Sequence, residues 1–447
     1  MYFLYFIVLV IACVAIIYLF RTKTEESQNE KTEKKENNSE YQKLNKSYLI
    51  VYSLVVTGDW LQGPYNYSLY QSYGFSLEKI GWLSVCGYLS SLILGTYVGS
   101  TADKFGRKKM CLVFCLLYGT SCLLRYISDF YVSLFSRVLG GISTSLLFSC
   151  FEAWLINEHN SKGFASSLLS NTLTWAAFLN GLTAIISGLI GNLVVNYFNY
   201  AAPYGVAVII FAISAVYIQH NWNENYGDTE DDKKEKKSSA LVKGINVIFK
   251  DSTILSVGLI QSFYEAAMYI FVFLYSPILE DAHRLAGHND ELPFGLIFSG
   301  FMVCIMIGSR IFNILTRHNW KVITISIPVF FLGTLSMLLP IITMNEYILY
   351  WAFALFEICC GMFFPTLGCI KSEIIPEEVR SSVMNLFRVP MNAIVVVVLL
   401  KISSFNQEVQ FIICTILCAL SLLLSGYILI KEKKKAKAAS SEKKMEI

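Results

Sequence analysis

The stretch GSTADKFGRKK, residues Gly99 to Lys109, separates two long apolar runs and decides how the rest of the chain is interpreted. Its charged residues are Asp103, Lys104, Arg107, Lys108 and Lys109. One charge at the centre of a bilayer costs roughly 2.5–3.5 kcal/mol, so these side chains do not belong in hydrocarbon. Gly99 and Gly106 allow a tight turn with close backbone approach. The stretch therefore predicts two membrane helices joined by a short aqueous turn, and its basic residues place that turn in the cytoplasm.

The composition indicates a membrane protein. The chain has 447 residues, of which 55% are hydrophobic and only 15% are charged, whereas a soluble domain carries about 25% charged residues. The twelve cysteines are scattered, without the spacing of metal ligands or redox pairs, and are expected to be small packing residues. No P-loop, zinc-protease helix or nucleophile elbow is present. We therefore expect a polytopic all-α protein that is not an enzyme, binds no metal or cofactor and has no nucleic-acid partner.

Apolar runs divide the chain into two similar halves. Residues 1–20 are long enough to span a bilayer and predict an N-terminal transmembrane anchor. The remaining segments are a disordered linker (21–47), a bundle of six helices (48–220), a central linker (221–252), a second bundle of six (253–430) and a basic tail (431–447). Two six-helix halves related by an axis along the membrane normal are a known transporter arrangement.

The distribution of basic residues predicts the orientation. Arg21 and Lys23 directly follow the first apolar run, and no basic residue precedes it. This favours an anchor with its N-terminus outside over a cleaved signal peptide. With the linkers, alternate turns and tail assigned to the cytoplasm, that side holds 29 of the 36 Lys and Arg residues, and the opposite side holds four. The C-terminus is then cytoplasmic.

Two short patterns resemble signatures of the major facilitator superfamily. The first is the turn itself, with Gly99, Asp103, Gly106 and Arg107 at the positions that close the cytoplasmic side of these transporters. The second is Arg137 followed by Gly140 and Gly141, and these glycines permit close helix contact. The resemblance implies two six-helix bundles that undergo alternating access, here with one extra N-terminal helix. A generic basic turn is the alternative for the first pattern.

Ionisable residues inside the predicted helices are candidates for function, because a charge in the bilayer is costly. They are Asp59, Arg137, Glu152, Glu265, Arg310, Glu357 and Arg388. In the facilitator arrangement the first, fourth, seventh and tenth helices line the central cavity. Asp59, Glu152, Glu265 and Glu357 lie on these helices, which suggests proton coupling. For each of them, the alternative is a structural ion pair between helices. Arg310, near a helix end, is expected to extend to the interface.

The eleventh helix carries the predicted substrate site. Asn385, Arg388 and Asn392, together with Ser381, recur at spacings that place them on one helical face. A guanidinium flanked by amide and hydroxyl donors suits an oxyanion. Arg137 is the second candidate cation. A polar seam packed against a neighbouring helix is the alternative interpretation.

Four longer blocks resemble the eukaryotic molybdate-anion transporter family. They are GDWLQGPYNYSLYQ (58–71), RVLGGISTSLLFSCFEAWLINEH (137–159), QSFYEAAMYIFVFLYSPIL (261–279) and IPEEVRSSVMNLFRVPMN (375–392). The resemblance implies uptake of molybdate, or a similar oxyanion, across the plasma membrane by a multi-pass protein, which we expect to be monomeric. The second half departs from the pattern, because the turn after residue 314 lacks the Asp and Gly-Arg of the first-half signature.

Two other functions stay open. Buried acids would equally suit a proton-coupled carrier of another anion or of an organic solute. A receptor or scaffold that transports nothing is the other alternative, although its cavity would be expected to lack ionisable residues. Molybdate and sulfate are both tetrahedral dianions, and the sequence does not separate them.

Overall fold

A computed structural model describes residues 1–19, 39–226, 243–288, 290–376 and 380–445. Residues 20–38 and 227–242, parts of the two predicted linkers, lie outside this description, as do the side chains of Asp103, Ser381 and Asn385. The chain divides into two compact units. The first is Met1–Asp232 with Pro293–Met302, and the second is Lys233–Leu292 with Val303–Ile447.

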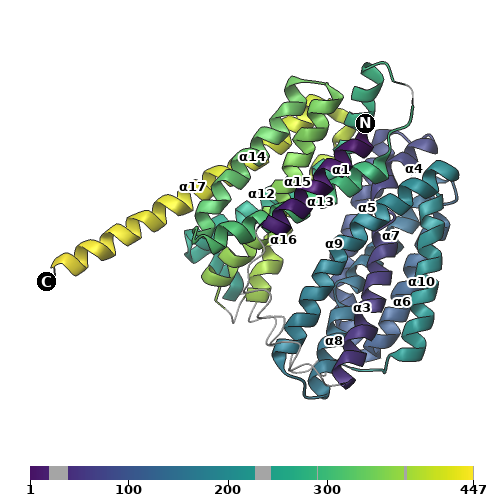
Figure 1. Cartoon of the computed structure of the whole chain (residues 1–447), viewed down its shortest axis with the longest axis horizontal. Helices are drawn as coiled ribbons and strands as arrows, with labels where there is room; N and C mark the ends of the chain where they lie inside the picture. The colour runs from purple at the N-terminus through teal and green to yellow at the C-terminus, as the bar shows by residue number, and fades with distance from the viewer. Residues whose placement is uncertain (20–38, 227–242, 289, 377–379, 446–447) are drawn as a thin grey trace. The chain divides into compact units, whose positions relative to one another are not determined.

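The first unit is a bundle of long helices, shown from purple to teal in Figure 1. Its elements are α1 (Tyr2–Leu19), α3 (Ser39–Trp60), η1 (Gly63–Tyr65), α4 (Asn66–Ser72), α5 (Leu77–Phe105), α6 (Arg107–Leu124), α7 (Phe130–Leu147), α8 (Cys150–Ser161), α9 (Ser166–Tyr197) and α10 (Ala202–Asn221). Helix α7 packs against α5 and α6, α10 packs against α6 and α3, and α3 packs against α9.

The second unit is also a bundle of long helices. They are α12 (Ser252–Leu285), α13 (Phe294–Arg317), α14 (Val322–Ile342), α15 (Glu346–Ile374), α16 (Arg380–Leu400) and α17 (Gln407–Met445), with η3 (Ile402–Ser404) before the last. The residues of α13 up to Met302 belong to the first unit. Helix α12 packs against α15, α16 and α17, and α14 packs against α15 and α17. The end of α17 projects away from its bundle as a single helix (Figure 1).

The predicted pattern of helices is confirmed. One helix precedes six segments (α3, α5, α6, α7 with α8, α9 and α10), and six more follow (α12 to α17). Within the described ranges there is no strand. By length and composition, nine helices of this part of the chain could cross a membrane. The other long helices, α3, α5, α6 and α16, carry charged residues.

Two predicted boundaries need correction. The first linker, predicted for residues 21–47, is wrong for its last nine residues, because α3 begins at Ser39. Its polar first turns bury Tyr41, Leu44 and Tyr48 on one face, and the Tyr41 hydroxyl donates to the Leu168 carbonyl at 3.1 Å. The burial of this amphipathic face outweighs the polar composition.

The second correction concerns the central linker, predicted for residues 221–252. Its first residues pack onto the bundle, and residues 243–250 are helical. The Trp222 and Trp154 rings stack with centroids 3.7 Å apart.

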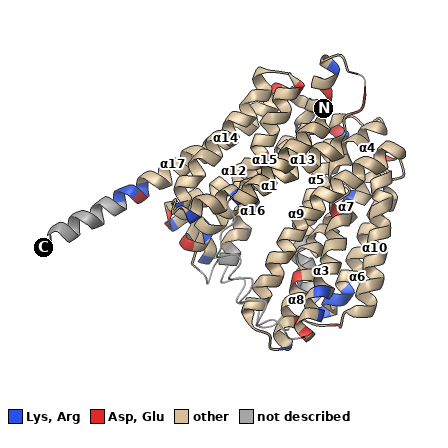
Figure 2. Ribbon diagram, viewed as in Figure 1, with Lys and Arg blue, Asp and Glu red and all other residues tan. Residues whose placement is uncertain are grey.

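Figure 2 shows Lys and Arg gathered beside α6 and α8 at this end of the first unit, while the long helices are mostly uncharged.

Candidate functional site

The turn between α5 and α6 is built around one carboxylate. Glu224 accepts hydrogen bonds from the backbone amides of Lys108 at 2.8 Å and Lys109 at 3.2 Å. These amides belong to the first turn of α6, where the helix dipole favours negative charge. Gly106 has φ of 103°, and a Cβ atom there would lie 2.5 Å from the Glu224 carboxyl carbon. The prediction that Gly106 permits a tight turn is therefore confirmed.

Arg107 holds this turn against neighbouring segments. Its Nη1 donates to the Ala153 carbonyl at 3.1 Å, and its backbone amide donates to the Asn225 carbonyl at 2.9 Å. Gly99 and Asp103 lie in the last turns of α5, but the side chain of Asp103 is outside the described ones. The gating role of all four predicted residues stays a prediction.

Arg137 binds a backbone carbonyl. Its Nε donates to the Leu83 carbonyl of α5 at 3.1 Å. A Cβ atom on Gly87 would lie 2.9 Å from the Arg137 guanidinium, and one on Gly141 would lie 1.9 Å from the Ser90 hydroxyl. The close helix contact expected at Gly141 is confirmed. The geometry gives Arg137 a part in joining α5 to α7.

The two candidate acids of the first unit have different surroundings. Asp59, near the end of α3, accepts a hydrogen bond of 2.5 Å from the Tyr118 hydroxyl of α6. Glu152 lies in the first turn of α8, and its side chain is exposed. No hydrogen bond or ion pair between described residues joins these two acids.

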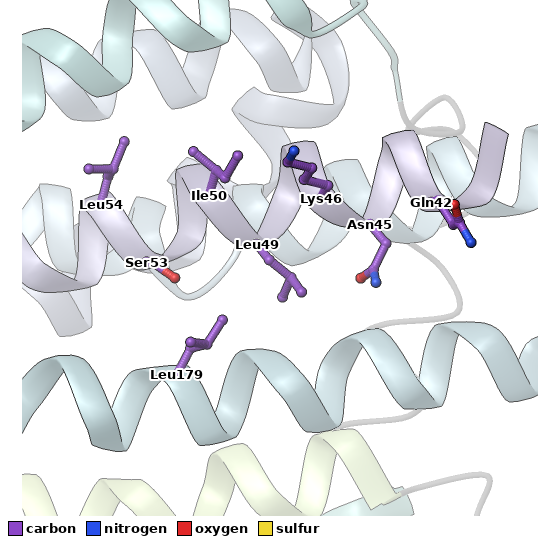
Figure 3. Close-up of a pocket in the computed structure, with 8 residues that line it drawn as sticks. All are labelled: Gln42, Asn45, Lys46, Leu49, Ile50, Ser53, Leu54 and Leu179. Carbon is purple, nitrogen blue, oxygen red and sulfur yellow. The ribbon is translucent and has the colours of Figure 1, made fainter. Parts of the chain in front are cut away.

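A groove of about 640 Å³ runs along α3. Seven of its lining residues come from one face of that helix, and Leu179 of α9 lies opposite (Figure 3). The α3 residues are Gln42, Asn45, Lys46, Leu49, Ile50, Ser53 and Leu54. Lys46 and three neutral polar side chains therefore share a surface that is otherwise apolar. The sequence predictions did not include this face.

The second unit brings one predicted acid and one predicted cation together. Glu265 of α12 interacts electrostatically with Lys371 of α15 and Arg388 of α16. The Lys371 ammonium donates to the Gln261 side-chain oxygen at 3.3 Å. Glu265 and Lys371 are half-buried, and Arg388 is exposed. Two positive charges therefore act on one negative charge, which leaves an excess of positive charge in this region.

Packing between α12 and α16 positions this cluster. The Ser262 hydroxyl donates to the Phe387 carbonyl at 2.8 Å, and a Cβ atom on Gly258 would lie 2.2 Å from the Phe387 ring. Because Ser262 is three residues before Glu265 and Phe387 directly precedes Arg388, this contact positions both charges.

The Asn392 amide donates to the Arg388 carbonyl at 2.8 Å, so it supports the helix near Pro390.

Lys371 is not among the predicted site residues, because its position after an apolar run predicts one of the 29 basic residues of the cytoplasmic side. The structure instead places it in the last turn of α15. No periodic pattern marks it, because its place beside Glu265 depends on the packing of α15 against α12. Glu357, on the same helix, is 7% exposed. Among the described residues it has no hydrogen bond or ion pair, so it is separate from the Glu265 cluster.

Another polar cluster lies where α12 ends and α15 begins. His283 Nδ1 is 2.9 Å from Glu346, and its Nε2 is 3.3 Å from Asp290. The His283 and His288 rings stack with centroids 4.8 Å apart. The pKa of the Asp290 carboxyl is lowered, first by a hydrogen bond from its own backbone and also by His283. Within the described ranges, no group of three or more His, Cys, Asp or Glu side chains is arranged to hold a metal ion.

Comparison with known proteins extends these observations. A family model described as sugar transporters with 12 transmembrane helices matches residues 1–350. The molybdate-anion transporter of Xenopus laevis is 32% identical over 421 residues, covering 91% of this chain and 90% of that protein. The molybdate-anion transporter of Danio rerio is 30% identical over 423 residues, covering 87% and 85% of the two chains.

Solved structures agree on the fold. The nucleoside transporter NupG matches with a TM-score of 0.64 at 14% identity, covering 87% of this chain and 98% of that one. A bacterial homologue of the human lysosomal transporter Spinster matches with a TM-score of 0.62 at 11% identity, covering 88% and 98%. With the family model, these likenesses assign the fold to the major facilitator superfamily. The chain is therefore a membrane transporter that belongs to the molybdate-anion transporter family.

Proposed function

We propose that this transporter carries molybdate, or a similar tetrahedral oxyanion, into the cell by alternating access across the plasma membrane. The observation that carries this proposal is the pair of cations, Lys371 and Arg388, around the single carboxylate of Glu265. The relatives named molybdate-anion transporter support the choice of substrate. The proposed orientation has the N-terminus outside and the Gly106 turn in the cytoplasm.

The chemistry of the cluster fits an oxyanion. A dianion that leaves water needs compensating charge, because desolvation otherwise makes binding unfavourable. Arginine presents a planar fork of donors to paired oxygens, whereas lysine acts as a point charge. Arg388 would therefore orient the substrate, and Lys371 would add attraction. Release of Glu265 from these cations on substrate binding would link binding to a rearrangement of α12, α15 and α16.

Uptake of radiolabelled molybdate by the purified protein in liposomes tests the proposal, with sulfate as competitor and with an imposed pH gradient. Arg388→Gln should abolish uptake, while Arg388→Lys keeps the charge, loses the fork and should retain weak uptake with lower affinity. Lys371→Gln should also lower affinity. Lys250→Gln, which removes an exposed cation near the start of α12, is the matched control and should behave as the parent.

Each result has a defined meaning. Normal molybdate affinity in a well-expressed Arg388→Gln variant would contradict the site and return it to Arg137. Absence of uptake in the parent, together with binding of no oxyanion, would favour the receptor or scaffold alternative. Uptake of a solute other than molybdate, driven by the pH gradient, would indicate a proton-coupled carrier of that solute. The buried acid Glu357 is the observation that favours this second candidate.

A further inference from the structure

Arg125 is a buried cation at the opposite end of α6 from the Gly106 turn. It follows the last residue of α6 as the cap of that helix, and it is only 2% exposed. Its place directly after an apolar run predicts an aqueous loop, and Arg125 is one of the four basic residues assigned to the side opposite the cytoplasm. A buried guanidinium is costly unless an anion or a set of well-placed acceptors compensates it. The contacts of Arg125 therefore need an explanation.

The hydrogen-bond partners of Arg125 are all neutral. Its Nε donates to the Ser136 hydroxyl at 3.3 Å, and its Nη1 donates to the Tyr204 hydroxyl at 3.3 Å and to the Asn66 side-chain oxygen. The Tyr204 ring lies 4.8 Å from the Arg125 Cζ, and the Tyr70 ring lies 5.8 Å from it. In the described part of the chain, no carboxylate pairs with Arg125 and no hydrogen bond involves its Nη2.

Hydroxyl groups on the same segments are buried without a partner. Among the described residues, the Tyr70 hydroxyl and the Ser133 hydroxyl have no hydrogen bond, although these residues are 2% and 0% exposed. The Tyr70 ring is one of the two that lie near the guanidinium, and Ser133 lies one turn before Ser136 on α7. The Ser68 hydroxyl, on α4 with Tyr70, is also buried and unpartnered. An unsatisfied buried hydroxyl is destabilising, and one of these hydroxyls is carried by a ring that lies against Arg125.

We propose that Arg125 and the surrounding hydroxyls, chiefly that of Tyr70, form a binding site for a small inorganic anion. The anion supplies the negative charge that the neutral cage lacks, and it accepts hydrogen bonds from the Arg125 Nη2 and from the unpartnered hydroxyls. Charge-assisted hydrogen bonds of this kind are the strong ones. The site lies wholly within the first unit and is separate from the Glu265 cluster of the second. It does not depend on the identity of the transported substrate.

A nearby tyrosine offers a matched control. The Tyr73 hydroxyl donates to the backbone carbonyl of Arg125 at 2.5 Å, so it already has a partner. Tyr73→Phe removes a structural hydrogen bond and leaves the proposed donors in place. Tyr70→Phe removes an unpartnered hydroxyl and keeps the ring beside Arg125. Both variants delete one tyrosine hydroxyl from the same segment. Only the hydroxyl lost in Tyr70→Phe is a proposed donor to the anion.

The test measures the thermal stability of the full-length purified protein in detergent. The first sample contains gluconate, and in the second sample chloride replaces gluconate at constant ionic strength. A third arm adds molybdate to the gluconate sample. An anion that binds the folded protein raises its stability, and we expect chloride or molybdate to raise the midpoint by about 2–4 °C. A response to chloride alone indicates a halide site, and a response to molybdate indicates an oxyanion site; either supports the proposal.

The variants decide whether the response belongs to this cage. Tyr70→Phe should lose most of the anion-dependent shift with little change in gluconate, while Tyr73→Phe should be less stable in gluconate and keep the shift. Arg125→Gln should lose the shift if it folds, and Tyr70→Phe keeps the proposal testable if it does not. Arg388→Gln should keep the shift, which separates this site from the proposed transport site. A parent without any shift, a full shift in Tyr70→Phe, or loss of the shift in Tyr73→Phe would overturn the proposal.

Discussion

At the residue scale, Gly106 couples the turn to the central linker. Its φ of 103° belongs to a region that is nearly restricted to glycine, where another residue is strained by about 1–3 kcal/mol. An alanine Cβ would also displace the Glu224 carboxylate, which caps α6. We therefore predict that Gly106→Ala lowers the thermal midpoint of the purified protein more than backbone strain alone explains.

Gly163 provides the control for this prediction. It also has positive φ, at 69°, but a Cβ atom there would meet nothing within 4 Å. Gly163→Ala should therefore show the cost of strain without the loss of a cap. Glu224→Gln should weaken the cap without strain, and in that background Gly106→Ala should cost less than in the parent. Equal losses in the Gly106 and Gly163 variants would show that the Glu224 contact contributes nothing.

Glu357 gives a second prediction at this scale. Its carboxyl group is 7% exposed and lacks a cation partner among the described residues, so burial favours its neutral form. We predict that Glu357→Gln, which resembles that form, leaves thermal stability and substrate exchange close to those of the parent. Accumulation driven by a pH gradient should be lost. Comparing exchange with gradient-driven uptake in liposomes checks this, and undiminished accumulation would exclude Glu357 from coupling.

At the element scale, the contact between α5 and α7 depends on Gly141. A Cβ atom there would lie 1.9 Å from the Ser90 hydroxyl and 2.5 Å from the Gly87 carbonyl. The carbonyl belongs to the backbone, so rotation of a side chain cannot relieve the overlap. Overpacking of this kind costs about 1–3 kcal/mol. We predict that Gly141→Ala lowers the thermal midpoint by several degrees and reduces transport with it.

Gly119, in the middle of α6, is the control for the Gly141 variant. A Cβ atom on it would meet nothing within 4 Å, and alanine is the better helix former by about 1 kcal/mol. Gly119→Ala should therefore leave the midpoint unchanged or raise it slightly. If both variants behave alike, the separation of α5 and α7 is not set by Gly141.

Features that depend on local sequence patterns could be predicted, whereas features that depend on packing between distant helices could not. Long apolar runs predict helices because a bilayer rewards both burial and internal hydrogen bonding. The charged turn at Gly106 and the close glycines of α7 follow from similarly local patterns. Lys371 and Arg125 could not be placed in this way. Their burial depends on packing between helices that are distant in sequence, and composition assigned both to aqueous loops.

At the scale of the whole molecule, the turn is predicted to hold the cytoplasmic side closed, because the superfamily resemblance assigns that role to Asp103 and Arg107. The groove along α3 offers a reporter position at Ser53 (Figure 3). The chain has twelve cysteines, of which ten are buried, while Cys86 and Cys369 are of intermediate exposure. Replacing these two by serine gives a background in which Ser53→Cys can be labelled selectively.

In that background we predict that Asp103→Asn increases the rate at which a membrane-impermeant thiol reagent, applied from the cytoplasmic side, labels Ser53→Cys. Loss of one member of a closing contact shifts a two-state equilibrium toward the open form without unfolding the protein, and a lost contact of about 1.4 kcal/mol changes the ratio of states tenfold. Lys104→Gln changes a charge in the same turn and should leave the rate unchanged. Equal labelling and transport in the parent and in Asp103→Asn would mean that this stretch only connects two helices, since a contact that closes the protein must alter the population of the closed state when it is removed.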